Sequence, residues 1–300
     1  MGRINRRKRS RLRQVVQHSA RFAGLRAKYQ GLGRGRATRP FEILGGSAKL
    51  APMVGELFRI THTKAQSFDQ CRKQYWFRYV SRLPAPPKRE SPPGMMGTGV
   101  HQALKVLCDT GESARGAEAL DTYLRMPLHE QLAPGTEYNA LAFQLFAAGC
   151  AAHASIESED RWAEISTWAP WPSRGINLMA RIDRADRLSP GVYQLIDWKT
   201  GTWGQDETND AQLDIGHVGL RIHRQMQDND TVLAVCWNLR TGERRERALR
   251  RDDAKATMAK MAALASRIQA EAAFEPSPGP ACTFCDWQNQ CPAGGVTWEE

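Results

Sequence analysis

Extended, β-prone patterns occupy two neighbouring segments in the middle of the chain. Residues 176–188 are mostly extended in character, and the stretch 192–198 (VYQLIDW) is rich in β-formers. The segment between them, Ser-Pro-Gly at 189–191, has the composition of a tight turn. Together these three segments predict a β-hairpin.

The hairpin brings charged side chains together. Because side chains alternate along a strand, Asp197 and Lys199 are expected on one face, and Ile196 and Trp198 on the other. A turn centred near Pro-Gly then sets Asp183 on the partner strand, close to the level of Asp197. The pattern therefore predicts two carboxylates and an amine at one place.

Helical patterns surround this hairpin. Expected helices are 63–81, 97–109, 114–125, 138–157, 210–225 and 252–273; further strands are 162–168, 231–239 and 243–249. Helices before, between and after the strands indicate an α/β fold. We expect an α/β/α sandwich with a central mixed sheet.

The composition fits a single globular domain. The chain has 300 residues, of which 41% are apolar, enough to bury a full core. Its apolar runs fall short of the roughly 20 residues needed to span a bilayer, so no membrane association is expected. We predict one domain at 48–300, closed by a cysteine-bearing segment at 276–295.

The net charge of +10 is concentrated at the beginning of the chain. Residues 1–41 contain 13 Lys or Arg and no Asp or Glu, which leaves 29 basic against 32 acidic residues elsewhere. We expect residues 1–47 to form a disordered basic arm suited to the phosphate backbone of nucleic acid. A nuclear or organellar targeting signal, or an extension without a role, are the alternatives.

The hairpin residues form a candidate metal site. Hard cations such as Mg²⁺ prefer carboxylate and carbonyl oxygens, which Asp183, Asp197 and the backbone carbonyl of Trp198 could supply. Lys199 could orient or deprotonate an attacking water and offset the charge that develops on a phosphate. An ordinary hairpin with exposed charges is the alternative.

The stretch 180–201 (ARIDRADRLSPGVYQLIDWKTG) resembles the PD-(D/E)XK nuclease superfamily, RecB-like branch, whose motif is roughly GxxDRxD…iiDxKTG. Asp183 matches the first metal ligand, Asp197 the second, and Lys199 the motif lysine. Ala180 stands where the family usually has Gly. The resemblance also implies a restriction-endonuclease-like fold and assigns a structural role to the second Asp of DRxD, Asp186.

Two further positions match the family. The small-residue lead before His101 (GTGVHQAL) resembles the start of the helix that carries the family's metal-binding His. Gln212 matches the Gln of a downstream Q-x-x-x-Y helix that helps position substrate. Gly216 occupies the Tyr position of that motif, so this part of the match is incomplete.

Three cysteines lie close together near the end of the chain. Cys282, Cys285 and Cys291 have the spacing C-x2-C-x5-C, one ligand short of a closed four-coordinate site. RecB-like nucleases with an iron–sulfur cluster, of the AddB and CRISPR-adaptation type, place the fourth Cys upstream, which implies Cys71 and a 4Fe–4S cluster. Zinc is the alternative, and an odd cysteine count argues against disulfides. The other cysteines, Cys108, Cys150 and Cys236, are expected to be small buried hydrophobes.

The resemblance implies a Mg²⁺- or Mn²⁺-dependent deoxyribonuclease, of the exonuclease type, acting on single-stranded DNA or DNA ends in repair or recombination. Its expected partners are DNA and a helicase or recombination protein, in the cytoplasm of a bacterium or of a phage's host. The alternatives are a non-catalytic DNA-binding or scaffolding subunit that retains the fold, and a cluster-based redox protein.

Overall fold

A computed structural model describes residues 57–86, 91–202 and 210–294, and its centre is a six-stranded mixed sheet. The strand order is β1-β3-β4-β5-β6, and β2 pairs with β3. The strands are β1 Phe58–Thr61, β2 Asp160–Trp171, β3 Ile176–Ser189, β4 Val192–Lys199, β5 Thr231–Asn238 and β6 Arg244–Leu249.

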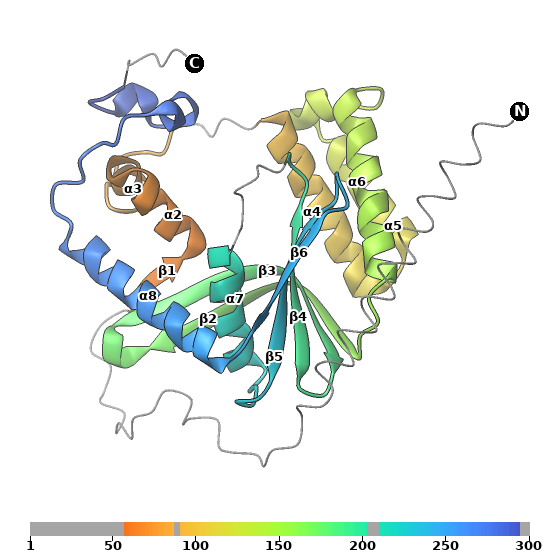
Figure 1. Ribbon diagram of the computed structural model, residues 1–300. Coiled ribbons are helices and arrows are strands. Elements are labelled where there is room, and N and C mark those ends of the chain that lie inside the picture. Colours follow the sequence, from red (N-terminus) through yellow and green to blue (C-terminus); the bar gives the residue numbers. More distant parts are fainter. Residues whose placement is uncertain (1–56, 87–90, 203–209, 295–300) are drawn as a thin grey trace, which may run out of the picture.

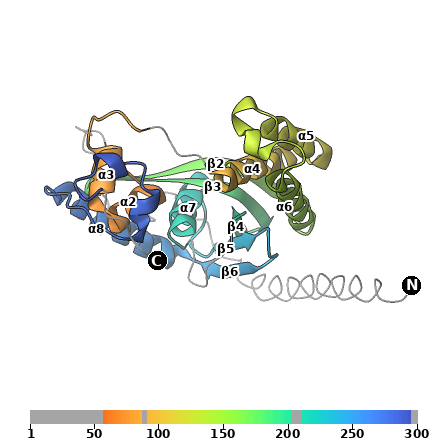
Figure 2. The same ribbon diagram turned by 90° about the horizontal axis from the view of Figure 1, so that it is seen from above.

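Helices cover both faces of this sheet (Figures 1 and 2). They are α2 His62–Gln70, α3 Arg72–Tyr79, α4 Pro92–Thr110, α5 Ser113–Leu124, α6 Glu137–Ala154, α7 Asp210–His223 and α8 Arg251–Ala270. Helices α4–α6 bury one face, and α7 and α8 lie on the other. The predicted α/β/α sandwich with a mixed sheet is therefore confirmed. None of the described helices is long and apolar enough to cross a membrane.

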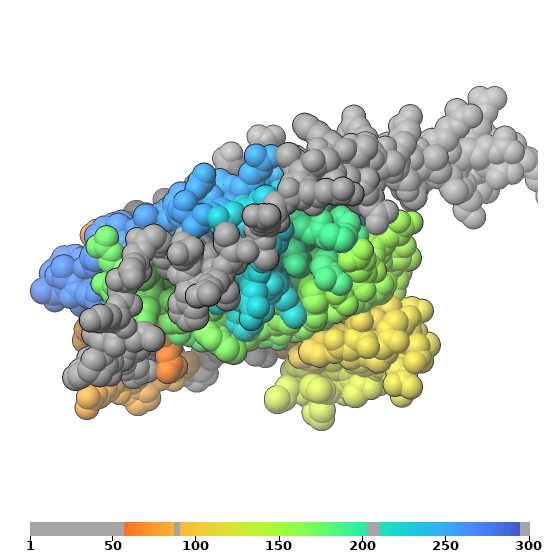
Figure 3. Space-filling view, turned by 90° about the horizontal axis from the view of Figure 1, so that it is seen from below, coloured from red at the N-terminus to blue at the C-terminus, as the bar shows by residue number. Residues whose placement is uncertain are grey.

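Two groups of helices project on the same side of the molecule. In the space-filling view, the orange surface of α2–α3 and the yellow surface of α4–α6 are separated by a hollow (Figure 3). The segment that carries the last three cysteines, dark blue in Figures 1 and 2, lies beside α2 and α3.

Strand β3 is the longest strand, and two strands share one of its edges. β1 pairs in parallel with Ile176–Met179, and β4 pairs antiparallel with Arg184–Ser189. β2 pairs along the other edge over almost the whole length of β3. Among the described strands, the edge of β3 at 180–183 therefore has no backbone partner, and we call this interval the β3 gap.

Most predicted elements agree with the structure to within a few residues, and three differ. The helix expected at 63–81 is two helices, because Cys71 has extended backbone angles (φ −159°, ψ 114°) and its sulfur caps α3 by accepting from the Gln74 N–H. α4 begins at Pro92 rather than Gly97, since Ser91 caps it and proline fits a first helical turn. The sheet begins earlier than predicted, with β1.

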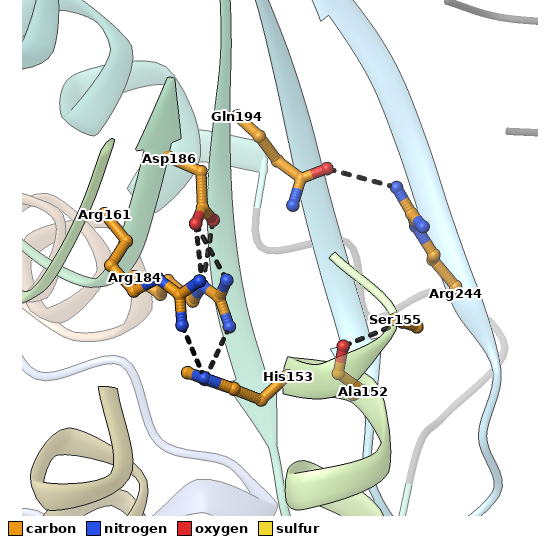
Figure 4. Close-up of polar contacts among 8 residues, drawn as sticks. All are labelled: Ala152, His153, Ser155, Arg161, Arg184, Asp186, Gln194 and Arg244. Atoms are coloured by element: carbon orange, nitrogen blue, oxygen red, sulfur yellow. Dashed lines mark hydrogen bonds and ion pairs between the residues drawn. The ribbon is translucent and has the colours of Figure 1, made fainter. Parts of the chain in front are cut away.

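A buried ion pair fixes the middle of β3 against α6. Arg184 and Asp186 are 1% and 0% exposed, and Nε and Nη2 of the guanidinium donate to the carboxylate at 2.8–3.1 Å. Figure 4 shows the Arg184 guanidinium between Asp186 and His153 of α6, whose ring nitrogens lie 2.9 Å from Arg184 Nη1 and 2.7 Å from Arg161 Nη1. Because loss of one partner would leave a buried charge, a cost of about 3–5 kcal/mol, Asp186 serves the fold, as expected.

Helix α7 carries a histidine with no polar partner. His217 is fully buried, and neither of its ring nitrogens forms a hydrogen bond within the part of the chain that the structure describes. Burial, together with the positive charges of Arg221 and Arg247, lowers the pKa of His217 to about 3. The folded protein therefore keeps this imidazole neutral.

His217 should make the protein sensitive to acid. The unfolded chain binds a proton at His217 below about pH 6.5, whereas the folded chain does so only near pH 3, so stability falls as the pH drops through that window. We expect His217→Leu to lose less unfolding free energy between pH 7 and pH 5 than the wild type, by urea denaturation. Equal losses in the two proteins would contradict this assignment.

Candidate functional site

Asp183 stands in the β3 gap, at the level where the β3–β4 ladder ends. The last pair of the ladder is Arg184 with Ile196, so the next level would join Asp183 and Asp197, as the hairpin pattern predicted. Instead of a backbone carbonyl, Asp183 Oδ2 accepts the backbone N–H of Trp198, at 2.8 Å. This contact ties the end of β4 to the carboxylate.

Asp197 and Lys199 share a face of β4, as expected. Lys199 Nζ lies 2.7 Å from Asp197 Oδ2, and Asp197 is 3% exposed. The Cys236 thiol of β5 also points at Asp197 Oδ2, with the sulfur 3.7 Å away. Ile196 and Trp198 join the core under α4–α6 on the opposite face.

His101 approaches the gap from α4. Its Nδ1 lies 3.4 Å from Asp183 Oδ1, so the helix expected to carry a metal-binding His does bring that ring to the first carboxylate. Burial lowers the pKa of His101, but the negative charges of Asp183, Asp197 and Glu164 outweigh burial and raise it overall. Gly97 permits this approach, since a Cβ there would lie 2.8 Å from Thr200 Oγ1.

Glu164 of β2 was not anticipated from the sequence. One ligand atom from each of His101, Glu164 and Asp183 lies within 4.8 Å of the others. Glu164 also forms an ion pair with Arg181. Burial and the charge of Asp183 raise the pKa of Glu164, which indicates crowded negative charge. Glu164 was missed in the sequence analysis because its position depends on an unusual backbone conformation, with φ +49°, which a sequence does not reveal.

His62 is a second residue that the sequence analysis missed. It follows β1 directly, as the first residue of α2, at the other end of the β3 gap. Burial lowers the pKa of His62, and the nearby positive charge of Lys199 lowers it further. The strand β1 has four residues, which is too short for its alternation of polar and apolar residues to predict a strand, so the sequence did not indicate that His62 lies here.

Gln212 lies half-buried in the first turn of α7, one turn before Gly216. At Gly216 the helix packs directly on the sheet, because a Cβ there would already lie 3.3 Å from Ile182 Cγ1. A tyrosine at this position would crowd Ile182 and Leu195 of the sheet, so the close packing accounts for the small residue here. The role of Gln212 stays a prediction.

The four cysteines singled out by the sequence meet at one place. Cys71, Cys282, Cys285 and Cys291 all line a single cavity between the start of α3 and the C-terminal segment. Cys71 Sγ accepts the backbone N–H groups of Gln74 and Ser277, each at 3.5 Å, and the Gln74 side chain donates to Cys285 Sγ at 3.6 Å. Donors aimed at sulfur are the surroundings that thiolate ligands need.

Of the remaining cysteines, Cys108 and Cys236 are buried, and Cys150 is only partly buried. The expectation of small buried hydrophobes thus holds for the first two and not fully for Cys150. Cys236 does more than fill space, because its thiol contacts Asp197.

Comparison with known proteins identifies one family. The family model of the PD-(D/E)XK nuclease superfamily matches residues 59–292. Among solved structures, one from Eubacterium rectale described as "Putative exonuclease" is 13% identical, with a TM-score of 0.48, and the match covers 81% of this chain and 90% of that one. The structure of SSO0001 is also 13% identical, with a TM-score of 0.33 and 78% and 96% coverage. No curated protein matches significantly.

Cys236 should resist alkylation in the folded protein. Burial and the charge of Asp197 raise the pKa of its thiol to about 12, and thiol reagents attack the thiolate. We expect iodoacetamide to leave Cys236 unmodified in native protein and to modify it after unfolding in guanidinium, by peptide mass mapping. Equal modification in both states would show that the thiol is accessible and not held against Asp197.

Proposed function

Because the chain belongs to the PD-(D/E)XK nuclease superfamily, we propose that it is a metal-dependent DNA nuclease, of the exonuclease type, acting on single strands or DNA ends. One observation carries the proposal. Asp183 accepts the Trp198 N–H at the β3 gap, which puts it beside the end of β4 where Asp197 and Lys199 form an ion pair. His101 of α4 reaches the Asp183 carboxylate from the side. The split cysteine set further supports the RecB-like branch with a cluster.

The residues present fit a divalent cation. His101 Nδ1 and Asp183 Oδ1 are separated by 3.4 Å, and one ligand atom of Glu164 lies within 4.8 Å of a ligand atom of each. We propose His101, Asp183, Asp197 and the Trp198 carbonyl as its ligands, with Mg²⁺ or Mn²⁺ as the ion. When bound, the ion would supply Lewis acidity at the phosphate oxygens.

Lys199 is proposed to act on the attacking water. Its ammonium is held 2.7 Å from Asp197, so its position is fixed before substrate arrives. The water oxygen bonds to phosphorus in line with the leaving 3′ oxygen, whose bond to phosphorus breaks. Lys199 orients this water, and the proton that the water loses passes to a neighbouring base or to solvent. Gln212 is proposed to help position the strand.

The cysteine cavity fits a 4Fe–4S cluster. Three sulfurs around one tetrahedral zinc would lie about 3.8 Å apart, given a Zn–S distance of about 2.3 Å. No three of the four sulfurs, all of which are described, lie within 4.8 Å of one another. This wider spacing favours a cluster over zinc. The cluster would be structural, joining Cys71 to the segment with Cys282, Cys285 and Cys291.

The wider setting follows from this activity. We propose a single nuclease domain at 48–300, closed by the cysteine segment at 276–295. A nuclease of this kind would act in DNA repair or recombination with a helicase or recombination protein, in the cytoplasm of a bacterium or of a phage's host. The arm at 1–47, proposed to contact DNA, lies outside the described residues.

Removal of the motif residues should abolish cleavage. We expect Lys199→Ala and Asp183→Ala to slow the degradation of end-labelled single-stranded DNA with Mg²⁺ by a factor on the order of 10² to 10⁴. DNA binding should stay measurable by fluorescence anisotropy. A matched control is Lys105→Ala, an exposed lysine on α4 that pairs with Asp109. Full activity in either motif variant would refute the catalytic assignment, and a protein that binds but never cleaves DNA would favour a scaffolding subunit.

Loss of one cysteine should remove the cluster. Purified wild type is expected to contain iron and to absorb near about 400 nm, as thiolate-held clusters do. Cys71→Ser should lose most of the iron and melt at a lower temperature, because metal binding and folding are coupled. Cys150→Ser, outside the cavity, serves as the control. Colourless wild type with stoichiometric zinc would instead support a zinc site.

A further inference from the structure

Glu164 has surroundings that neither the family motif nor the hairpin pattern explains. Its side chain is 8% exposed, yet it lies beside another carboxylate, Asp183, rather than only among cations. A buried carboxylate is retained at such a place only if something compensates its charge. Its described ion-pair partner is Arg181, whose own side chain is 71% exposed to solvent.

The backbone around Glu164 departs from regular strand geometry. In β2, Trp162 and Ile165 both pack in the core cluster that includes α7, although residues three apart should face opposite sides. In β3, Ile182 and Ala185 do the same. Each strand thus contains one residue more between these positions than regular alternation allows. The β2–β3 ladder accordingly passes from the pair Ala163–Arg184 directly to the pair Ile165–Ile182.

The two residues skipped by the ladder are Glu164 and Asp183. Ala163 pairs with Arg184, and the Arg184 side chain points toward His153 on the α6 side. Glu164 holds a left-handed backbone with φ +49°, which side chains rarely adopt and which concentrates at functional sites. The irregularity therefore turns two carboxylates toward the same ring, that of His101 on α4.

We propose that Glu164 is a ligand of the divalent cation, together with His101 and Asp183. One nitrogen and two carboxylate oxygens within 4.8 Å of one another match the ligand set of a small divalent ion. Asp183 is suited to be the central ligand of this group. Its Oδ1 faces His101, and its Oδ2 is kept in place by the hydrogen bond from the Trp198 N–H. This inference rests on the proposed metal-dependent function.

The assignment separates the site into two sides. On the side of α4 and β2, Glu164 joins His101 and Asp183 as a ligand of the ion. On the side of β5, Asp197 Oδ2 takes the Lys199 ammonium and the Cys236 thiol, which fixes the lysine. Asp197 Oδ2 is therefore directed toward Lys199 and Cys236, and Glu164 provides a carboxylate next to His101 and Asp183.

Direct metal binding tests this without reference to cleavage. The probe is Mn²⁺ alone, titrated into full-length protein and followed by the electron paramagnetic resonance signal of the free ion. We expect Glu164→Gln, which keeps the shape and removes the charge, to weaken binding by on the order of tenfold or more. Asp160→Asn, an exposed carboxylate on the same strand that pairs with Arg187, should bind like the wild type.

Thermal melts distinguish a ligand from a structural residue. Relief of charge crowding should leave the Tm of metal-free Glu164→Gln equal to or above that of wild type, and the rise in Tm on adding Mn²⁺ should shrink. Unchanged Mn²⁺ affinity, or a lower metal-free Tm with a full Mn²⁺ response, would overturn the inference. Failure of wild type to bind Mn²⁺, or unchanged binding by Asp183→Asn, would refute the metal site itself.

Discussion

The sharing of one edge of β3 between β1 and β4 is the constraint from which the site follows. A strand interior without a neighbour leaves backbone groups to be satisfied by side chains. At this interval the Trp198 N–H, which would continue the ladder, bonds to the Asp183 carboxylate instead. The end of β1 brings His62 to the interval, the end of β4 brings Lys199, and α4 brings His101 from the side.

This arrangement concentrates negative charge in a half-buried place, and the protein compensates it only in part. Neighbouring carboxylates raise the pKa of His101, and burial together with the charge of Asp183 raises the pKa of Glu164. Such crowding opposes folding of the metal-free chain, whereas the buried Arg184–Asp186 pair three residues along β3 is fully hydrogen-bonded. The contrast separates the crowded charges at the proposed metal site from the paired charges that serve the fold.

The sequence predicted what regular periodicity and turn chemistry control. The Pro-Gly turn and the alternation in β4 were sufficient to set Asp183 level with Asp197 and to put Lys199 on the same face. The fold class followed from the order of helices and strands. Glu164 was not predicted as a site residue, because its position depends on a left-handed backbone conformation that its residue type does not indicate. Cys71 was expected in the cysteine site, but the break it causes between α2 and α3 was hidden by an unbroken run of helix-compatible residues.

The cysteine cavity has a consequence for how the chain is made. Cys71 Sγ accepts from Ser277, 206 positions later, and shares its cavity with thiols beyond that point. At synthesis rates of roughly 5–20 residues per second, on the order of 10 to 40 seconds pass before those partners leave the ribosome. During that interval Cys71 lacks the C-terminal residues that line the cavity with it. Closure of this cavity therefore has to wait until the C-terminal segment has been synthesised.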